Sequence, residues 1–448
     1  MLYLTAVQSA QPLVEAPRGH HIIGPADRKR EVEVSQCGLQ WRTMRPPFSP
    51  VHAVMHRIKT YNAISPTGLD RFERERYEVG QDIAHPDALL LRSYKLQEDE
   101  IPDSVTAIAR AGAGVNNIPL GRCSERGIPV FNTPGANANA VKELVVAAML
   151  LASRDIVGGI AFAQSQEATM SAQDMNALME REKKRFAGAE LAGKTLGVVG
   201  LGAIGSLVAR MGLNFGMDVL GFDPALSVET AWRLPSDVQR MENVQSLVSG
   251  SDFVSLHLPV LDSTRGLVNA ELLGHFKQGG CLLNFAREEI VSIEAVVAAL
   301  GSGQLRRYVT DFPHPQLLGR QDTLLMPHIG ASTAEAEENC AVMAANQLRA
   351  FLEHGNIRNS VNFPAIELDR TTDYRITIAN RNEPGTLSHI LTLIGDAGLN
   401  VADLLNKSVG DIAYNIIDLD EFPRQTLLEE IRGLEGVINL RLIEGAPQ

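Results

Sequence analysis

The chain has few cysteines for its length, and their arrangement excludes two classes of protein. Only four of its 448 residues are cysteines, and no two of them form a C-x-x-C pair. A disulfide-rich secreted scaffold and a structural zinc site are therefore not expected. We predict a protein of a reducing compartment, the cytoplasm, without a bound metal.

Long hydrophobic runs are also missing. The longest one, residues 144–152, is followed by Arg154 and Asp155. It is far shorter than the roughly 20 apolar residues of a membrane-spanning helix, so we expect a soluble chain with no membrane partner.

Positive charge is in deficit. The chain carries 41 Lys and Arg against 53 Asp and Glu, a net charge of −12. Excess negative charge repels phosphate backbones, which makes nucleic acid a poor candidate partner. At roughly 150 residues per domain, the length predicts about three domains.

The first 54 residues show no periodic apolar face and no signal-peptide core. They mix charges of both signs at 28–33 and are rich in proline at 46–50. We expect a disordered extension or an over-extended start upstream of Met55. A transit peptide is a weaker match, because such peptides are poor in acidic residues.

Short apolar runs alternate with helical segments, which is typical of βαβ units around buried parallel sheets. We therefore predict two α/β domains with Rossmann-like, doubly wound parallel sheets. The expected strands of the earlier domain are 58–64, 88–91, 107–109 and 129–131. Those of the later domain are 195–199, 217–222, 252–258, 280–284 and 308–312.

A separate small domain is expected near the C-terminus, with the ferredoxin-like order β-α-β-β-α-β. Apolar and polar residues alternate at 374–379, and an apolar helix stripe follows at 387–394. Further strands are expected at 412–419 and 437–443, around a helix at 424–434.

A glycine motif follows the expected strand 195–199. In Gly200-Leu201-Gly202-Ala203-Ile204-Gly205, the first glycine allows a tight turn, the second lets the backbone approach a pyrophosphate, and the third permits close helix packing. Asp223 lies 18 residues after Gly205, at the end of the next strand, where a carboxylate can bind a ribose diol. It would repel a 2′-phosphate, so NAD is favoured over NADP. The alternative is a glycine-rich turn without a ligand.

An arginine and a histidine follow two later strands. Arg287 comes after the strand 280–284, and His328 stands in Pro327-His328-Ile329-Gly330 about forty residues later. Hydride transfer at C2 of a hydroxy acid needs a cation for the carboxylate and a group that exchanges the hydroxyl proton. Both side chains can reach the carboxyl edge of the sheet. The alternatives are a surface or salt-bridged arginine and a histidine beside a proline turn.

Three stretches carry a resemblance to a known family: AGAGVNNI at 111–118, FNTPGANANAVKEL at 131–144 and PHIGASTAEAEENC at 327–340. Here the chain resembles the D-2-hydroxyacid dehydrogenases, and among them the D-3-phosphoglycerate dehydrogenases. The resemblance implies an oxidoreductase that oxidises 3-phospho-D-glycerate to 3-phosphohydroxypyruvate with NAD, the first step of L-serine biosynthesis. A dehydrogenase of glycerate, lactate or 2-hydroxyglutarate, and a non-catalytic NAD-binding regulator, remain alternatives.

The same resemblance implies roles for individual residues. Arg287 matches the arginine that binds the substrate carboxylate, and His328 matches the acid/base histidine. Asp311 matches an aspartate beside the nicotinamide, with helix capping as the alternative. The remaining cofactor contacts expected are Gly200, Gly202, Ala203, Ile204, Gly205, Asp223 and Ala286. The expected substrate contacts are Arg92, Ser93 and Asn116.

The resemblance also implies a domain order in which a nucleotide domain interrupts a substrate domain. We expect the substrate-binding domain at 55–116 and 331–365, and the NAD-binding domain at 117–330. A linker at 366–371 then leads to a regulatory domain at 372–448.

Two positions depart from the family. The family has a glutamate soon after the aspartate to orient the histidine, but residues 312–316 hold no carboxylate. Either Glu335 or Glu337 reaches His328, or the imidazole works with a lower pKa. Glu288 stands where glycine is common, and its carboxylate either pairs with Arg287 or faces solvent.

The C-terminal domain resembles an ACT domain, a small regulatory module. Asn382 and Asn400 match asparagines that bind serine between paired modules, whereas Asn380 stands where those versions carry histidine. We therefore expect an L-serine effector and a homodimer or homotetramer. The alternative is that these asparagines only form turns and the domain only dimerises.

Overall fold

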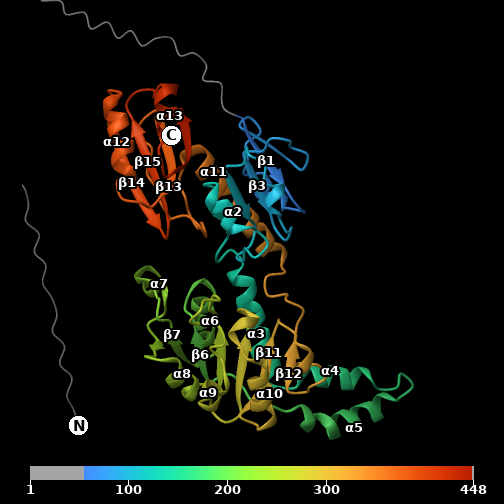
Figure 1. Cartoon of the computed structure of the whole chain (residues 1–448). Coiled ribbons are helices and arrows are strands. Elements are labelled where there is room, and N and C mark those ends of the chain that lie inside the picture. Colours follow the sequence, from blue (N-terminus) through green and yellow to red (C-terminus); the bar gives the residue numbers. More distant parts are fainter. Residues whose placement is uncertain (1–54, 446–448) are drawn as a thin grey trace, which may run out of the picture. The chain divides into compact units, whose positions relative to one another are not determined.

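The computed structural model describes residues 55–445, so the expectations for residues 1–54 lie outside the described part (Figure 1). It contains three sheets, with strand orders β2-β1-β3-β4-β5, β12-β11-β10-β9-β6-β7-β8 and β14-β15-β13-β16. Every strand pair in the first two sheets is parallel, and every pair in the third is antiparallel. The predicted fold class is confirmed.

The first sheet is built on short apolar strands that are buried on both faces. In β3 all four residues are buried, as expected for a central parallel strand. Its strands are β1 (His56–Thr60), β2 (Tyr77–Gly80), β3 (Ala88–Leu91), β4 (Ala107–Arg110) and β5 (Val130–Phe131). Its helices are α1 (Pro66–Leu69), α2 (Leu120–Glu125) and α11 (Ala334–His354).

The second sheet has β6 at the point where the strand order reverses. Ligands of open α/β sheets bind beside the carboxyl ends of the strands at such a point. Its strands are β6 (Thr195–Val199), β7 (Asp218–Phe222), β8 (Val238–Arg240), β9 (Phe253–Leu256), β10 (Gly280–Asn284), β11 (Leu305–Thr310) and β12 (Thr323–Leu325). Its helices are α3 (Ala138–Ser153), α6 (Ala203–Asn214), α7 (Val228–Arg233), α8 (Val244–Gly250), α9 (Ala270–Gly274) and α10 (Ile293–Gly301). Short 3-10 turns lie at Glu98–Glu100, Lys183–Phe186, Glu288–Ile290 and Pro315–Leu317.

The predicted boundary between residues 116 and 117 lies too early in the chain. Strand β5 pairs with β4, so the chain up to Phe131 belongs to the first sheet. The chain then continues through α3 to the second sheet and returns in α11, whose Ala341 and Leu348 join the core of the first sheet. The strand pattern places residues 129–131 in the earlier domain, but the bounds taken from the resemblance end that domain at residue 116, before this strand.

Two helices after α3 bury none of their residues. They are α4 (Ile156–Gln164) and α5 (Ala172–Glu182), and the sequence pattern did not predict them. No single helix in residues 55–445 is long and apolar enough to cross a bilayer. The pair α3 and α4 reaches that threshold only together, and the chain bends by 71° between them.

The C-terminal sheet packs on both faces. One face lies under α12 (Thr386–Asp396) and α13 (Gln425–Arg432). On the other face, Tyr414 and Ile416 join the core that contains Phe351 of α11. The strands are β13 (Tyr374–Arg381), β14 (Val401–Val409), β15 (Ile412–Leu419) and β16 (Val437–Glu444).

Polar contacts fix this domain to the last turn of α11. Arg375 is fully buried, forms an ion pair with Asp418, and donates from Nη1 to the His354 carbonyl at 2.9 Å. Arg441 donates to the carbonyls of Phe351 and Leu352, at 3.2 and 3.1 Å. Three of the last four carbonyls of α11, those of Phe351, Leu352 and His354, are therefore bound by the last domain.

Candidate active site

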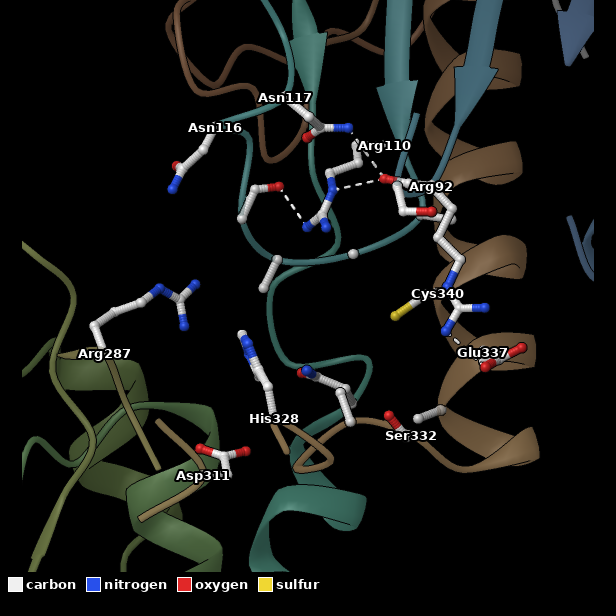
Figure 2. A pocket seen from close by; sticks show the side chains of 18 of the residues that line it. Arg92, Arg110, Asn116, Asn117, Arg287, Asp311, His328, Ser332, Glu337 and Cys340 are labelled. Atoms are coloured by element: carbon white, nitrogen blue, oxygen red, sulfur yellow. Dashed lines mark hydrogen bonds and ion pairs between the residues drawn. The ribbon is translucent and has the colours of Figure 1, made fainter. Parts of the chain in front are cut away.

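A cavity of about 850 Å³ lies where loops of the first sheet face loops of the second (Figure 2). It brings together six of the residues predicted from the sequence. These are Arg92, Ser93, Asn116, Arg287, Asp311 and His328. Gly200 and Asp223 lie at the ends of β6 and β7 and do not line it.

Arg287 follows β10 and is held by its own loop. The Asn284 side chain donates to the Arg287 carbonyl at 2.9 Å, and Arg287 Nη1 donates to the Ala286 carbonyl at 2.7 Å. Within residues 55–445 Arg287 forms no ion pair, so Glu288 does not neutralise it. The rest of the guanidinium points into the cavity (Figure 2) and can bind a carboxylate.

His328 has a strained backbone. Its φ is +53°, a left-handed conformation that is uncommon for residues other than glycine and clusters at functional sites. The His328 N–H donates to the Asp311 carbonyl at 2.9 Å, and the imidazole packs edge-on against Phe312 with ring centroids 4.9 Å apart. These contacts direct the ring into the same space as Arg287 (Figure 2).

Neither of the two expected acids pairs with the His328 imidazole. Glu337 forms an ion pair with Arg92, and Glu335 lines a neighbouring cavity. No side chain in the described part of the chain hydrogen-bonds to this ring. The described residues therefore do not support the first alternative, that Glu335 or Glu337 reaches His328.

Asp311 is buried beside His328 at the end of β11. Its Oδ2 accepts the Gly330 N–H at 3.0 Å, whereas Oδ1 is buried with no partner. Burial raises the pKa of Asp311, against the lowering effects of the Gly330 N–H and the nearby His328 and Arg287. A buried acceptor without a donor is costly, and a carboxamide N–H of a bound nicotinamide would satisfy it.

The glycine turn has the geometry that the motif predicts. Gly200 has a φ of +90°, and a Cβ there would lie 2.4 Å from the His257 carbonyl oxygen. A Cβ on Gly205 would lie 1.9 Å from the Gly200 carbonyl oxygen. Helix α6 starts next to Gly202, which provides no side-chain cap, so its first N–H groups are free for a phosphate.

Asp223 is positioned by backbone N–H groups. Its Oδ2 accepts from Leu201 at 2.8 Å and its Oδ1 from Ala225 at 2.9 Å. The carboxylate is therefore fixed next to the glycine turn, where it can still accept from a ribose diol. His257 offers another buried partner for a cofactor, because its Nδ1 has none and burial lowers its pKa to about 3. These residues fit a dinucleotide.

Arg110 is a cavity residue that the sequence interpretation missed. It donates from Nε to the Arg92 carbonyl at 3.0 Å and from Nη1 to the Gly114 carbonyl at 2.6 Å. Burial lowers its pKa, and the charges of Arg287 and Arg92 lower it further. The available signal was its place at the carboxyl end of β4. Asn117, also missed, donates to the carbonyls of Arg92 and Tyr94.

The cavity carries charges of both signs. Arg92, Arg110 and Arg287 are the arginines among its lining residues. Its acids include Glu288, Glu289 and Glu337, of which Glu288 was considered from the sequence beside Arg287 and Glu337 beside His328, but not Glu289. Ser332 and Cys340 also line it and were missed.

The two predicted effector asparagines each have a partner within the C-terminal domain. The Asn382 side chain donates to the Gly410 carbonyl at 3.2 Å, and the Asn400 side chain donates to Asp420 at 2.6 Å. Both face solvent. Asn380 is buried and accepts from Asn415 at 2.7 Å.

Comparisons with known proteins agree with this geometry. Residues 146–330 match the NAD-binding domain of the D-isomer specific 2-hydroxyacid dehydrogenases, and residues 374–436 match the ACT domain. The chain is 30% identical over 417 residues to the D-3-phosphoglycerate dehydrogenase of Haemophilus influenzae, covering 88% of this chain and 96% of that protein. It is 31% identical over 367 residues to the enzyme of the same name from Escherichia coli K12, covering 78% and 84%.

A solved structure of a protein with the same printed activity is also similar to this chain. The NAD+-bound 3-phosphoglycerate dehydrogenase of Entamoeba histolytica superposes with a TM-score of 0.54 at 25% identity, covering 70% of this chain and 100% of that one.

Proposed function

Because the chain belongs to the D-isomer specific 2-hydroxyacid dehydrogenase family, we propose that it oxidises 3-phospho-D-glycerate to 3-phosphohydroxypyruvate with NAD, the first step of L-serine biosynthesis. The observation that carries the proposal is that Arg287 and His328 face one cavity, next to the unsatisfied Asp311. The similarity to relatives named D-3-phosphoglycerate dehydrogenase covers most of the chain.

The chemistry follows from these positions. Arg287 binds the C1 carboxylate and polarises the oxygen on C2. His328 accepts the C2 hydroxyl proton while the hydride leaves C2, and it returns that proton in the reverse reaction. A bound NAD supplies the hydride acceptor. The turn of Gly200, Gly202, Ala203, Ile204 and Gly205, with Asp223 and Ala286, would hold it.

The phosphate of the substrate would lie on the opposite side of the cavity. Arg92 and Ser93 follow β3, and Asn116 lies in the loop that Arg110 holds. Guanidinium, hydroxyl and amide donors are the groups that bind a phosphate dianion.

A steady-state assay tests the proposal. The purified chain should oxidise NADH with phosphohydroxypyruvate far better than with hydroxypyruvate, glyoxylate or 2-oxoglutarate. An enzyme that binds NADH but leaves phosphohydroxypyruvate unreacted would contradict it. If the chain is instead a non-catalytic regulator, it should bind NADH and leave all four keto acids unreacted.

The second candidate is a dehydrogenase of an unphosphorylated 2-hydroxy acid. The observation that favours it is the ion pair between Arg92 and Glu337, which occupies the arginine needed for a phosphate. Arg92→Ala separates the candidates, because it should raise the KM for phosphohydroxypyruvate alone if the first is right.

For assembly and regulation, we propose a cytoplasmic homodimer or homotetramer that L-serine inhibits. Helices α4 and α5 bury no residue, and Val157 and Ile160 of α4 are 48% and 53% exposed, as expected for a surface that a second copy covers. Asn382 and Asn400 supply amides for serine. Light scattering should give a dimer or larger, and Asn382→Ala should abolish inhibition by serine. A monomer, or inhibition that is unchanged, would contradict these points.

A further inference from the structure

The first turn of α11 places one carboxylate against the predicted phosphate-binding arginine. Thr333 caps the helix, accepting the Ala336 N–H at 3.1 Å, and Glu335 and Glu337 follow in the first turn. Residues two apart on a helix point in different directions. Glu337 therefore lines the 850 Å³ cavity, whereas Glu335 lines a separate cavity of about 210 Å³.

The contact between Glu337 and Arg92 is close but open to water. Glu337 Oε1 lies 2.6 Å from Arg92 Nη2, and the side chains are 43% and 38% exposed. Ion pairs of this exposure contribute little to stability. The pair is thus able to open when a ligand offers Arg92 a better anion.

We propose that Glu337 is a specificity-determining residue: it occupies Arg92 in the free enzyme and competes with the phosphate of the substrate for that guanidinium. The inference rests on the proposed function, because it concerns the phosphate side of the same cavity.

The competition follows from charge. Only Nη2 of Arg92 contacts Glu337, so a phosphate dianion that binds Arg92 shares the guanidinium with the Glu337 carboxylate and lies near it, and like charges at that range repel. A keto acid without a phosphate meets no such repulsion there. Glu337 therefore weakens the binding of phosphorylated substrates relative to unphosphorylated ones.

The direct test compares Glu337→Gln with Glu335→Gln. The second variant removes the same charge from the same helix turn but does not touch Arg92. With NADH saturating, Glu337→Gln should lower the KM for phosphohydroxypyruvate about two- to fivefold relative to that for hydroxypyruvate, the range expected for releasing a partly exposed pair. Glu335→Gln should leave the ratio of the two KM values unchanged.

A binding measurement separates this inference from the proposed function. Calorimetric titration of the NADH-loaded full-length protein with phosphoglycolate needs no turnover. Glu337→Gln should tighten phosphoglycolate about two- to fivefold, and the gain should vanish in an Arg92→Ala background. If wild type leaves phosphohydroxypyruvate unreacted, the proposed function fails while this titration still decides the role of Glu337. Weaker or unchanged phosphoglycolate binding in Glu337→Gln would overturn the inference.

Discussion

Replacing Asp311 with asparagine should separate a cofactor contact from a structural residue. In the wild type, the Gly330 N–H donates to Asp311 Oδ2 at 3.0 Å. The side-chain oxygen of an asparagine can still accept this hydrogen bond. Its NH2 group then stands where the unpartnered oxygen of Asp311 is, facing the donor that we expect from the nicotinamide. The variant loses the charged oxygen that would accept a nicotinamide N–H, and it places the asparagine NH2 donor against that N–H donor. Such a loss costs about 1–3 kcal/mol, so the Kd for NADH should rise about 5- to 150-fold.

The same substitution should not destabilise the protein. Burial raises the pKa of Asp311, so the folded state binds more protons than the unfolded state. The ionised carboxylate then costs stability, and that cost appears as the pH rises from the ordinary carboxyl pKa of about 3.9 through the raised folded value. Above this window Asp311→Asn should melt at or above the wild-type temperature, and the difference should shrink below it.

The measurements are an NADH fluorescence titration and thermal melts at several pH values. Asp322→Asn is the matched control, because Asp322 lies just before β12 in a partly exposed pair with Arg320. It should change neither NADH affinity nor, by more than about 1 kcal/mol, stability. Wild-type NADH affinity in Asp311→Asn, or a clear loss of stability at neutral pH, would refute the assignment.

Three further substitutions test other parts of the fold. Gly205→Ala puts a Cβ 1.9 Å from the Gly200 carbonyl oxygen, so α6 must shift. In a titration NADH should bind at least about tenfold more weakly, a cost of roughly 1.4 kcal/mol; unchanged affinity would contradict the role of this turn in cofactor binding. Asp223→Ser removes the charge that repels a 2′-phosphate, and the NADPH to NADH ratio of kcat/KM should rise severalfold; a constant ratio would count against Asp223. Asp418→Asn leaves Arg375 buried without its counter-charge, and urea unfolding should reveal a loss of about 3–5 kcal/mol; a loss under 1 kcal/mol would argue that Arg375 is satisfied by carbonyls alone.

The sequence predicted five of the seven strands of the second sheet but missed the short strands β8 and β12. A strand, a glycine turn and an acid such as Asp223 lie within one βαβ unit, where local spacing determines their relative positions. Arg287 and His328 could also be placed, because parallel strands bring their carboxyl ends to one edge.

The residues that approach from the first sheet were harder to predict. Whether Glu335 or Glu337 faces the cavity depends on the rotation of α11 about its axis, which the packing of Ala341 and Leu348 sets. Arg110 makes its contacts through carbonyls of a loop, and backbone groups leave no signature in the sequence. Helices α4 and α5 were also missed, because neither buries a residue and so neither needs a periodic apolar face.

Helix α11 joins the ACT domain to the candidate active site. Its 21 residues contain neither glycine nor proline, so it is one stiff rod of roughly 30 Å. In its first turn Glu337 forms an ion pair with Arg92, and at its C-terminal end the carbonyls of Phe351 and His354 accept hydrogen bonds from the ACT domain. A tilt of that domain would therefore move the first turn of α11, which holds Glu337 beside Arg92 at the predicted phosphate side of the cavity.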